Sequence, residues 1–239
     1  MRRFFAPPDR FDGTQIALAP DETRHLRKVL RLGVGDEANV FDGEGQEFYC
    51  SIREISKGGA TLSVIEQVPP VCPESPLDLT LAPTVLNGDK YDLIVQKAVE
   101  LGVKHFVPLI TLRCEVKPKD AMRRVERWRR IVLEATKQCG RATLMNVAEP
   151  VEFEKLVSDP SVDNAVMFSE RDGAEFKNLK IGKKITALIG PKGGWDDSEL
   201  TMARSSALRI VTLGGRILRS ETAAMAITSI LQHRFGDLQ

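Results

Sequence analysis

Short apolar runs separated by turn residues fill the first seventy positions of the chain. We expect β-strands at Arg2–Phe5, Thr14–Leu18, Glu37–Phe41, Phe48–Ile55 and Ala60–Val68. Between them lie glycine-containing turn sequences, which favour tight reversals of the chain. Many short strands with tight turns are typical of a small β-barrel, so residues 1–70 are predicted to form one.

One helix is expected within this region, from Asp21 to Arg31, with Asp21 as its N-cap. Leu26, Val29 and Leu30 share one face of this helix, which would pack on the barrel. Another side carries only basic residues, namely Arg24, Arg27, Lys28 and Arg31. A charged run is often only a solvated face, but cations without interleaved acids repel one another. We therefore expect this stripe to contact an anionic partner such as RNA phosphate.

A proline-rich stretch from Val68 to Pro76 separates the barrel from the rest of the chain, and residues 71–76 are predicted to be a linker. Strands and helices alternate after it. Strands are expected at Leu77–Leu81, His105–Leu109, Ala165–Phe168, Ile185–Ile189 and Ile210–Leu213. Helices are expected at Tyr91–Leu101, Ala121–Gln138, Val151–Val157, Asp197–Ser206 and Glu221–Phe235. This alternation predicts an α/β domain with a mostly parallel sheet over residues 77–239.

Composition narrows the functional classes. The four cysteines form no CxxC pair and there are only three histidines, so neither a metal site nor a disulfide framework is expected. Prolines and an aspartate interrupt the amino terminus where a signal peptide would be apolar, and no apolar run approaches the ~18–20 residues of a membrane span. We expect a cytoplasmic protein without a membrane segment.

Positive charge is concentrated in one part of the chain. Between Arg113 and Arg141 there are ten lysine and arginine residues and four acidic ones, whereas the whole chain has a net charge of only +1. This distribution is typical of a specific nucleic-acid surface. The expected RNA contacts here are Arg113, Arg123, Arg124 and Arg141. Trp128 lies at helical spacing from Val125, Ile131 and Val132, so it is predicted to be a core residue and not a base-stacking one.

Two glycine-rich turns follow predicted strands near the carboxyl end, GPKGGW at residues 190–195 and LGGRILRSETA at residues 213–223. Glycines there let the backbone approach a ligand, and open α/β sheets bind ligands at the carboxyl ends of their strands. Either turn could equally be a simple reversal with surface arginines at 216 and 219. Asp196 or Asp197 would cap the helix after the first turn, and Ser220 would cap the helix after the second.

Together these two sequences resemble the carboxy-terminal signature of the SPOUT superfamily, and more narrowly the bacterial family that methylates N3 of a uridine in 16S ribosomal RNA. Further matches to that family occur in order along the chain, at Arg24–Leu26, Val29–Leu32, Gly35–Asp36, Lys90, Gln96–Val103, Arg127–Trp128, Ile131, Glu134–Ala135, Gln138 and Arg141. Two positions depart from the family pattern. Lys192 stands where the family usually has glutamate, and a usual proline is missing near Met145.

The resemblance implies an RNA-binding PUA-like β-barrel, a trefoil-knotted α/β domain that binds S-adenosylmethionine, and a homodimer. The substrate would be 16S ribosomal RNA or the assembled small ribosomal subunit, with the target uridine in the decoding region. The cofactor would be held by Phe168, Gly190, Pro191, Gly194, Leu213, Gly214, Ile217 and Leu218. Ile217 and Leu218 suit an apolar wall for adenine.

The resemblance also raises candidates for catalysis. N3 of uracil carries a proton that must leave as the methyl group arrives, and in paired RNA the base must first be flipped out. Arg219 could stabilise the negative charge that develops on the uracil oxygens, and Glu221 could orient it or accept a proton. Glu221 is more simply explained as a carboxylate in the first turn of a helix.

Two other functions fit part of the pattern. A catalytically silent RNA-binding assembly factor would keep the basic faces without using the cofactor. A nucleotide-using enzyme would instead hold phosphate in the glycine turns, although these lack the GxGxxG and GxxxxGK[ST] patterns.

Overall fold

The computed structural model describes residues 2–56, 58–160, 162, 164–206 and 208–238. Within these residues the chain forms two compact units. The first comprises the chain up to Glu74 together with Leu133–Leu144, and the second comprises Ser75–Val132 and the chain from Met145 onward. No helix in the described part of the chain is both long and apolar enough to cross a membrane.

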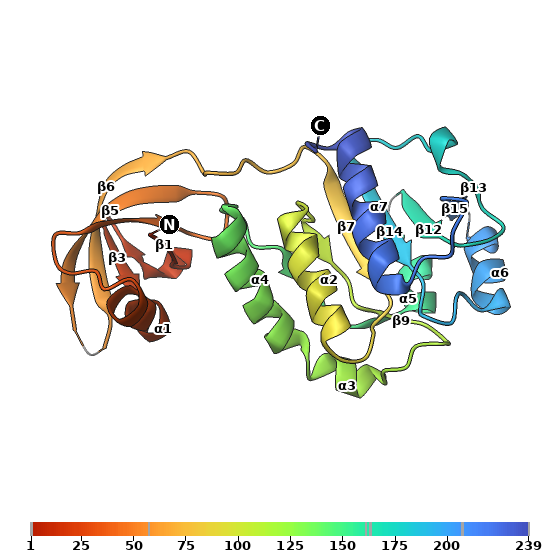
Figure 1. The fold of residues 1–239 in the computed structure, drawn as a ribbon, viewed down its shortest axis with the longest axis horizontal. Coiled ribbons are helices and arrows are strands. Elements are labelled where there is room, and N and C mark those ends of the chain that lie inside the picture. The colour runs from red at the N-terminus through yellow and green to blue at the C-terminus, as the bar shows by residue number, and fades with distance from the viewer. Residues whose placement is uncertain (1, 57, 161, 163, 207, 239) are drawn as a thin grey trace. The chain divides into compact units, whose positions relative to one another are not determined.

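The first unit contains a curled six-stranded sheet (Figure 1). Its strands are β1 (Arg3–Phe5), β2 (Phe11–Asp12), β3 (Gln15–Leu18), β4 (Glu37–Phe41), β5 (Glu47–Ile55) and β6 (Ala60–Val68), in the order β1-β4-β5-β6-β3-β2. A short 3-10 helix, η1 (Pro8–Arg10), precedes β2. Phe4, Ile16, Val40, Ile52 and Leu62 are fully buried in its core. Among the described residues of this region, the five predicted strands are confirmed, and the two-residue β2 was missed.

The helix of the first unit differs from its prediction. Helix α1 (Pro20–Arg24) has Ala19 as its N-cap and Pro20 in its first turn, so the prediction that Asp21 caps it is wrong. Proline suits the first helical position because it lacks an N–H that would need a partner there. The helix continues as a π-helix, η2 (His25–Val29).

The π-helix changes which residues of this segment are buried. The backbone N–H of Leu30 bonds to His25 O, five residues back, and this wider turn rotates Val29 away from the face that carries Leu26. Leu26 is therefore fully buried, whereas 67% of Val29 is exposed. The prediction that Val29 packs on the barrel is wrong.

The second unit is built on parallel strands. They are β7 (Asp78–Pro83), β8 (His105–Phe106), β9 (Leu109–Ile110), β10 (Asn146–Val147), β11 (Val151–Glu152), β12 (Ala165–Phe168), β13 (Ala174–Glu175), β14 (Lys184–Ile189) and β15 (Arg209–Thr212). The main sheet has the order β10-β8-β7-β14-β12-β15-β13, and β9 pairs with β11. The single strand predicted at His105–Leu109 is split between β8 and β9, because Pro108 lacks the N–H that a sheet ladder requires.

Six helices and one 3-10 helix begin in the described part of this unit. They are α2 (Asp89–Glu100), α3 (Pro118–Met122), α4 (Val125–Cys139), α5 (Phe153–Ser158), η3 (Phe176–Asn178), α6 (Asp197–Ser205) and α7 (Ser220–Phe235). The one helix predicted over Ala121–Gln138 is therefore two, α3 and α4, separated by a turn. Trp128 of α4 is fully buried, as predicted. Helix α7 packs on α2, β7 and β14, while α5 and α6 pack on each other (Figure 1).

The strand order determines which loops meet. Phe168 at the end of β12 is in register with Ile189 of β14 on one side and with Val211 of β15 on the other. The two glycine turns begin just after β14 and β15, so they lie on either side of the end of β12 at one edge of the sheet. This edge holds the candidate site.

Candidate active site

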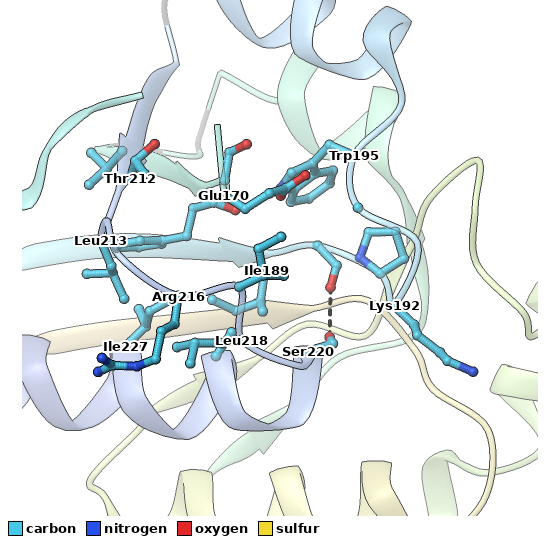
Figure 2. A pocket seen from close by; sticks show the side chains of 18 of the residues that line it. Glu170, Ile189, Lys192, Trp195, Thr212, Leu213, Arg216, Leu218, Ser220 and Ile227 are labelled. Atoms are coloured by element: carbon cyan, nitrogen blue, oxygen red, sulfur yellow. Dashed lines mark hydrogen bonds between the residues drawn. The ribbon is translucent and has the colours of Figure 1, made fainter. Parts of the chain in front are cut away.

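A cavity of about 380 Å³ opens where the carboxyl ends of β12, β14 and β15 meet (Figure 2). It is lined by residues 168–170, 189–195, 211–218, 220, 223 and 227. The structure therefore brings together all the residues predicted to hold a cofactor, namely Phe168, Gly190, Pro191, Gly194, Leu213, Gly214, Ile217 and Leu218. The volume lies in the range of about 300–1,000 Å³ typical of small-molecule sites.

The first turn is shaped around a buried tryptophan. Trp195 is 1% exposed, and its indole N–H donates to the carbonyl oxygen of Phe168 at 2.7 Å. A Cβ atom on Gly190 would lie 2.9 Å from the indole Nε1, so only glycine fits there. Gly194 has a φ of +72°, a conformation that side chains disfavour. The turn thus leaves its backbone exposed to the cavity.

A network of hydrogen bonds holds the end of this turn. Asp196 caps α6 and forms a capping box with Glu199, which confirms the predicted aspartate cap. Hydrogen bonds from Ser198, assisted by the nearby Arg113, lower the pKa of Asp196. Glu199 also accepts the backbone N–H of Leu112 at 2.9 Å. The loop after β9 is thereby attached to the start of α6.

Arg113 belongs to the same network. Its guanidinium donates to the carbonyl oxygens of Gly193 at 3.0 Å and Trp195 at 3.2 Å, and to the carboxylate of Asp196 at 3.1 Å. From its place in the basic stretch, Arg113 was predicted to contact RNA. The structure instead shows its side chain engaged with the first glycine turn, which it braces from outside the cavity.

The second turn is fastened to the first through Ser220. Gly214 and Gly215 have φ values of +78° and +80°, so the chain reverses there through two left-handed residues. The hydroxyl of Ser220 then donates to Gly190 O at 2.7 Å, as Figure 2 shows. The prediction that Ser220 caps α7 is wrong: Arg219 holds the N-cap position, and the hydroxyl is used to join the two turns.

Neither candidate catalytic residue lies among the described residues that line the cavity. Arg219 is exposed at the start of α7. The carboxylate of Glu221 pairs with Lys90 at 3.0 Å. Burial acts to raise the pKa of Glu221, but the hydrogen bond from its own backbone N–H and the charges of Lys90 and Arg219 outweigh it and lower the pKa. Glu221 is therefore an ionised, weakly basic group, which agrees with its structural explanation.

Several residues that line the cavity were not predicted from the sequence. Ser169 and Glu170 directly follow β12, Thr212 ends β15, and Trp195 ends the first turn. Their signal was positional, because polar residues after a buried parallel strand point to the edge where ligands bind. That rule was applied to the glycine turns but not to the residues after Phe168.

The predicted RNA contacts differ in exposure. Arg24, Arg27, Lys28 and Arg31 are exposed on the first unit, and Arg123 is exposed on the second. Arg124 is half-buried and donates to Leu86 O at 3.3 Å.

Arg141 does not agree with its predicted role. It is 2% exposed and pairs with Glu74 at 2.7 Å within the first unit. Because its side chain is buried and engaged, the expectation that Arg141 contacts RNA is wrong.

Family models match both parts of the chain. An RNA methyltransferase domain matches residues 73–232, and an RNA methyltransferase PUA domain matches residues 18–65. The ribosomal RNA small subunit methyltransferase E of Aquifex aeolicus is 32% identical over 92% of this chain and 95% of its own length. The chain belongs to the ribosomal RNA small subunit methyltransferase E family. This confirms the family resemblance read from the two glycine turns.

A further relative and two solved structures are also similar to this chain. The Synechocystis enzyme is 33% identical over 92% of this chain and 74% of its own length. The crystal structure of the Neisseria gonorrhoeae enzyme bound to S-adenosylmethionine is 32% identical, covers 100% of both chains and has a TM-score of 0.90. A methyltransferase from Legionella pneumophila, in complex with the same cofactor, is 29% identical, covers 100% of this chain and 99% of its own, and also has a TM-score of 0.90.

Proposed function

We propose that this methyltransferase transfers the methyl group of S-adenosylmethionine to N3 of a uridine in the decoding region of 16S ribosomal RNA. The observation that carries the proposal is the cavity enclosed by the two glycine turns and Phe168. Two structures with high similarity to this chain contain S-adenosylmethionine. The relatives are named as ribosomal RNA small subunit methyltransferases, and the exact position of the methyl acceptor comes from the family resemblance.

The residues of the cavity fit this cofactor. Backbone N–H and carbonyl groups of the turns at Gly190–Gly194 and Leu213–Gly215 would bind its polar groups, and Ile217 and Leu218 would pack on adenine. Bound S-adenosylmethionine supplies an activated methyl group, so the protein has chiefly to align it with the acceptor and exclude water.

The acceptor nitrogen requires loss of a proton. Arg219 would stabilise the negative charge that develops on the uracil oxygens as the N3 proton leaves. We propose that Glu221 positions Lys90 and the start of α7 and does not accept this proton, because its lowered pKa makes it a weak base.

We further propose that the domains of the chain have separate functions. Residues 1–70 would form a PUA-like barrel that binds RNA through Arg24, Arg27, Lys28 and Arg31. Residues 71–76 would form a linker, and residues 77–239 would form the catalytic domain. Arg123 and Arg124 would add a second RNA contact. The family resemblance also leads us to propose a trefoil knot in the catalytic domain, a homodimer and a cytoplasmic location.

Mass mapping of methylated uridines tests the proposed reaction. Ribosomal RNA from a strain that lacks the protein should lose one N3-methyluridine, and purified protein with S-adenosylmethionine should restore it. Adding the protein separately to free RNA and to small subunits identifies the substrate. An unchanged methylation map would refute the proposal, and failure to bind S-adenosylmethionine in calorimetry would favour a silent assembly factor.

Gly214→Val provides the matched inactive variant. Gly214 has a φ of +78°, and an added Cβ would meet no atom within 4 Å, so valine acts chiefly by straining the backbone of the second turn. We expect it to abolish cofactor binding and methylation while RNA affinity remains. Gly35→Val is the control, because Gly35 has a φ of +90° and similar open space but lies in the first unit. It should keep cofactor affinity.

A further inference from the structure

The acidic residue of the cavity, Glu170, has no role in the reaction described above. Glu170 directly follows β12 and lines the cavity near both turns (Figure 2). Among the described lining residues it is the one acid, and the bases are Lys192 and Arg216. Apart from these three charged residues, the described lining consists of backbone, apolar and hydroxyl groups.

The two basic side chains do not neutralise Glu170. The side chain of Lys192 is 74% exposed, and its ion pair is with Glu115 at 3.8 Å. Arg216 is exposed as well. Figure 2 shows the charged ends of Lys192 and Arg216 extending away from the middle of the cavity, toward opposite sides. Neither of these two lining bases forms an ion pair with Glu170 in the described part of the chain, and its cationic neighbour is Arg171, outside the lining, at 3.9 Å.

The carboxylate of Glu170 is also free to accept hydrogen bonds. Its ion pair with Arg171 spans 3.9 Å, which is too long for a hydrogen bond, and the described part of the chain gives its carboxylate no hydrogen-bond donor. One oxygen lies 2.9 Å from where a Cβ of Gly194 would be, so the group sits against the first turn. Its side chain is 35% exposed, and partial burial strengthens its attraction to a positive charge.

We propose that Glu170 binds a positively charged group of the cofactor and thereby orients its amino-acid end against the first turn. This inference rests on the proposed use of S-adenosylmethionine, which carries a sulfonium and an α-ammonium group. Both are cations, and a carboxylate that accepts no hydrogen bond from the protein gains more from a charged donor than from a neutral hydroxyl. Glu170 would act by binding and would take no part in proton transfer.

Calorimetry with three ligands tests this role. The ligands are S-adenosylmethionine, S-adenosylhomocysteine, which lacks the sulfonium charge, and 5′-methylthioadenosine, which lacks both charges. We expect Glu170→Gln to weaken S-adenosylmethionine about tenfold, a loss of about 1.4 kcal/mol, and to leave 5′-methylthioadenosine unchanged. A loss confined to S-adenosylmethionine identifies the sulfonium as the partner, and a loss shared with S-adenosylhomocysteine identifies the ammonium.

Two results would overturn the proposal: unchanged affinity for S-adenosylmethionine, or an equal loss for all three ligands, which would indicate contact with the nucleoside or a distorted turn. Glu175→Gln is the control, because it removes the same charge from a nearby residue. Glu175 pairs with Lys177 and does not line this cavity. If the wild-type protein binds none of the ligands, the proposed function itself fails. If it binds them and the variant binds equally well, only the role of Glu170 fails.

Discussion

Gly190→Ala should disrupt the candidate site from its centre, because the residue lies against a rigid neighbour. The added Cβ would meet the indole of Trp195 at 2.9 Å from Nε1, 3.0 Å from Cε2 and 3.2 Å from Cδ1. Trp195 is 1% exposed and packed against Phe153, so it has little room to move. Any shift also lengthens its 2.7 Å hydrogen bond to Phe168 O.

The cost follows from these contacts. Overpacking a well-packed core costs about 1–3 kcal/mol, and a weakened buried hydrogen bond adds about 1 kcal/mol. We expect a net loss of about 3 kcal/mol in the free energy of unfolding of the second unit. For a chain of this length, that lowers the thermal midpoint by roughly 6–12 °C. Affinity for S-adenosylmethionine should fall too, because Gly190 and Phe168 both line the cavity.

Gly193→Ala is the matched control within the same turn. Its Cβ would lie 3.6 Å from Arg113 Cδ, an ordinary van der Waals contact. Alanine at such a position changes stability by no more than about 1 kcal/mol, and can raise it by restricting the unfolded chain. Differential scanning calorimetry measures the thermal midpoints of the two variants, and we expect that of Gly190→Ala to be the lower. Equal thermal midpoints would show that Trp195 does not constrain Gly190.

Three further predictions concern charged residues. Arg113→Ala should raise the Kd for S-adenosylmethionine about tenfold in calorimetry and leave RNA affinity intact. Arg113→Lys should restore the affinity only in part, because lysine lacks the planar guanidinium fork. Loss of RNA binding alone would instead support the predicted role of Arg113 in RNA contact. Glu221→Gln should destabilise the protein by about 0.5–1 kcal/mol at neutral pH. Because the pKa of Glu221 is lowered from 4.5, this difference should persist above pH 4.5 and vanish as the pH falls through the lowered value in thermal melts; a constant difference would contradict it. Replacing Arg24, Arg27 and Lys28 by alanine should weaken RNA binding and reduce its salt slope by about 0.7 per lost phosphate contact; an unaltered slope would exclude this helix.

Much of the fold was predictable because strand and helix periodicities are local. The predicted strand Ala165–Phe168 agrees with β12 to the residue, and Glu37–Phe41 agrees with β4. The order of the strands in the sheet was not predictable. An apolar run indicates that a strand is buried, but it does not indicate which strand lies beside it. The insertion of β12 between β14 and β15 therefore appeared only in the structure.

The site was predictable in its residues more than in its bonds. Glycine spacing and family resemblance identified the two turns. A serine before a helix suggests an N-cap, however, and no local sequence signal indicates that the hydroxyl of Ser220 bonds to the carbonyl oxygen of Gly190 instead. Arg141 was misjudged for a similar reason. Its partner Glu74 lies 67 residues away in the sequence, so a count of local charge treats a buried ion pair as a free cation.

The bond between Ser220 and Gly190 has a consequence for the order in which the site forms. The first turn, β14 and β12 are synthesised before residue 213, yet the cavity lacks one wall until the second turn has been made and α7 has docked. A chain emerging from the ribosome thus has no complete cofactor pocket until α7 is available to fold. Cofactor binding and docking of α7 are coupled, so saturating ligand stabilises this late-forming helix by mass action.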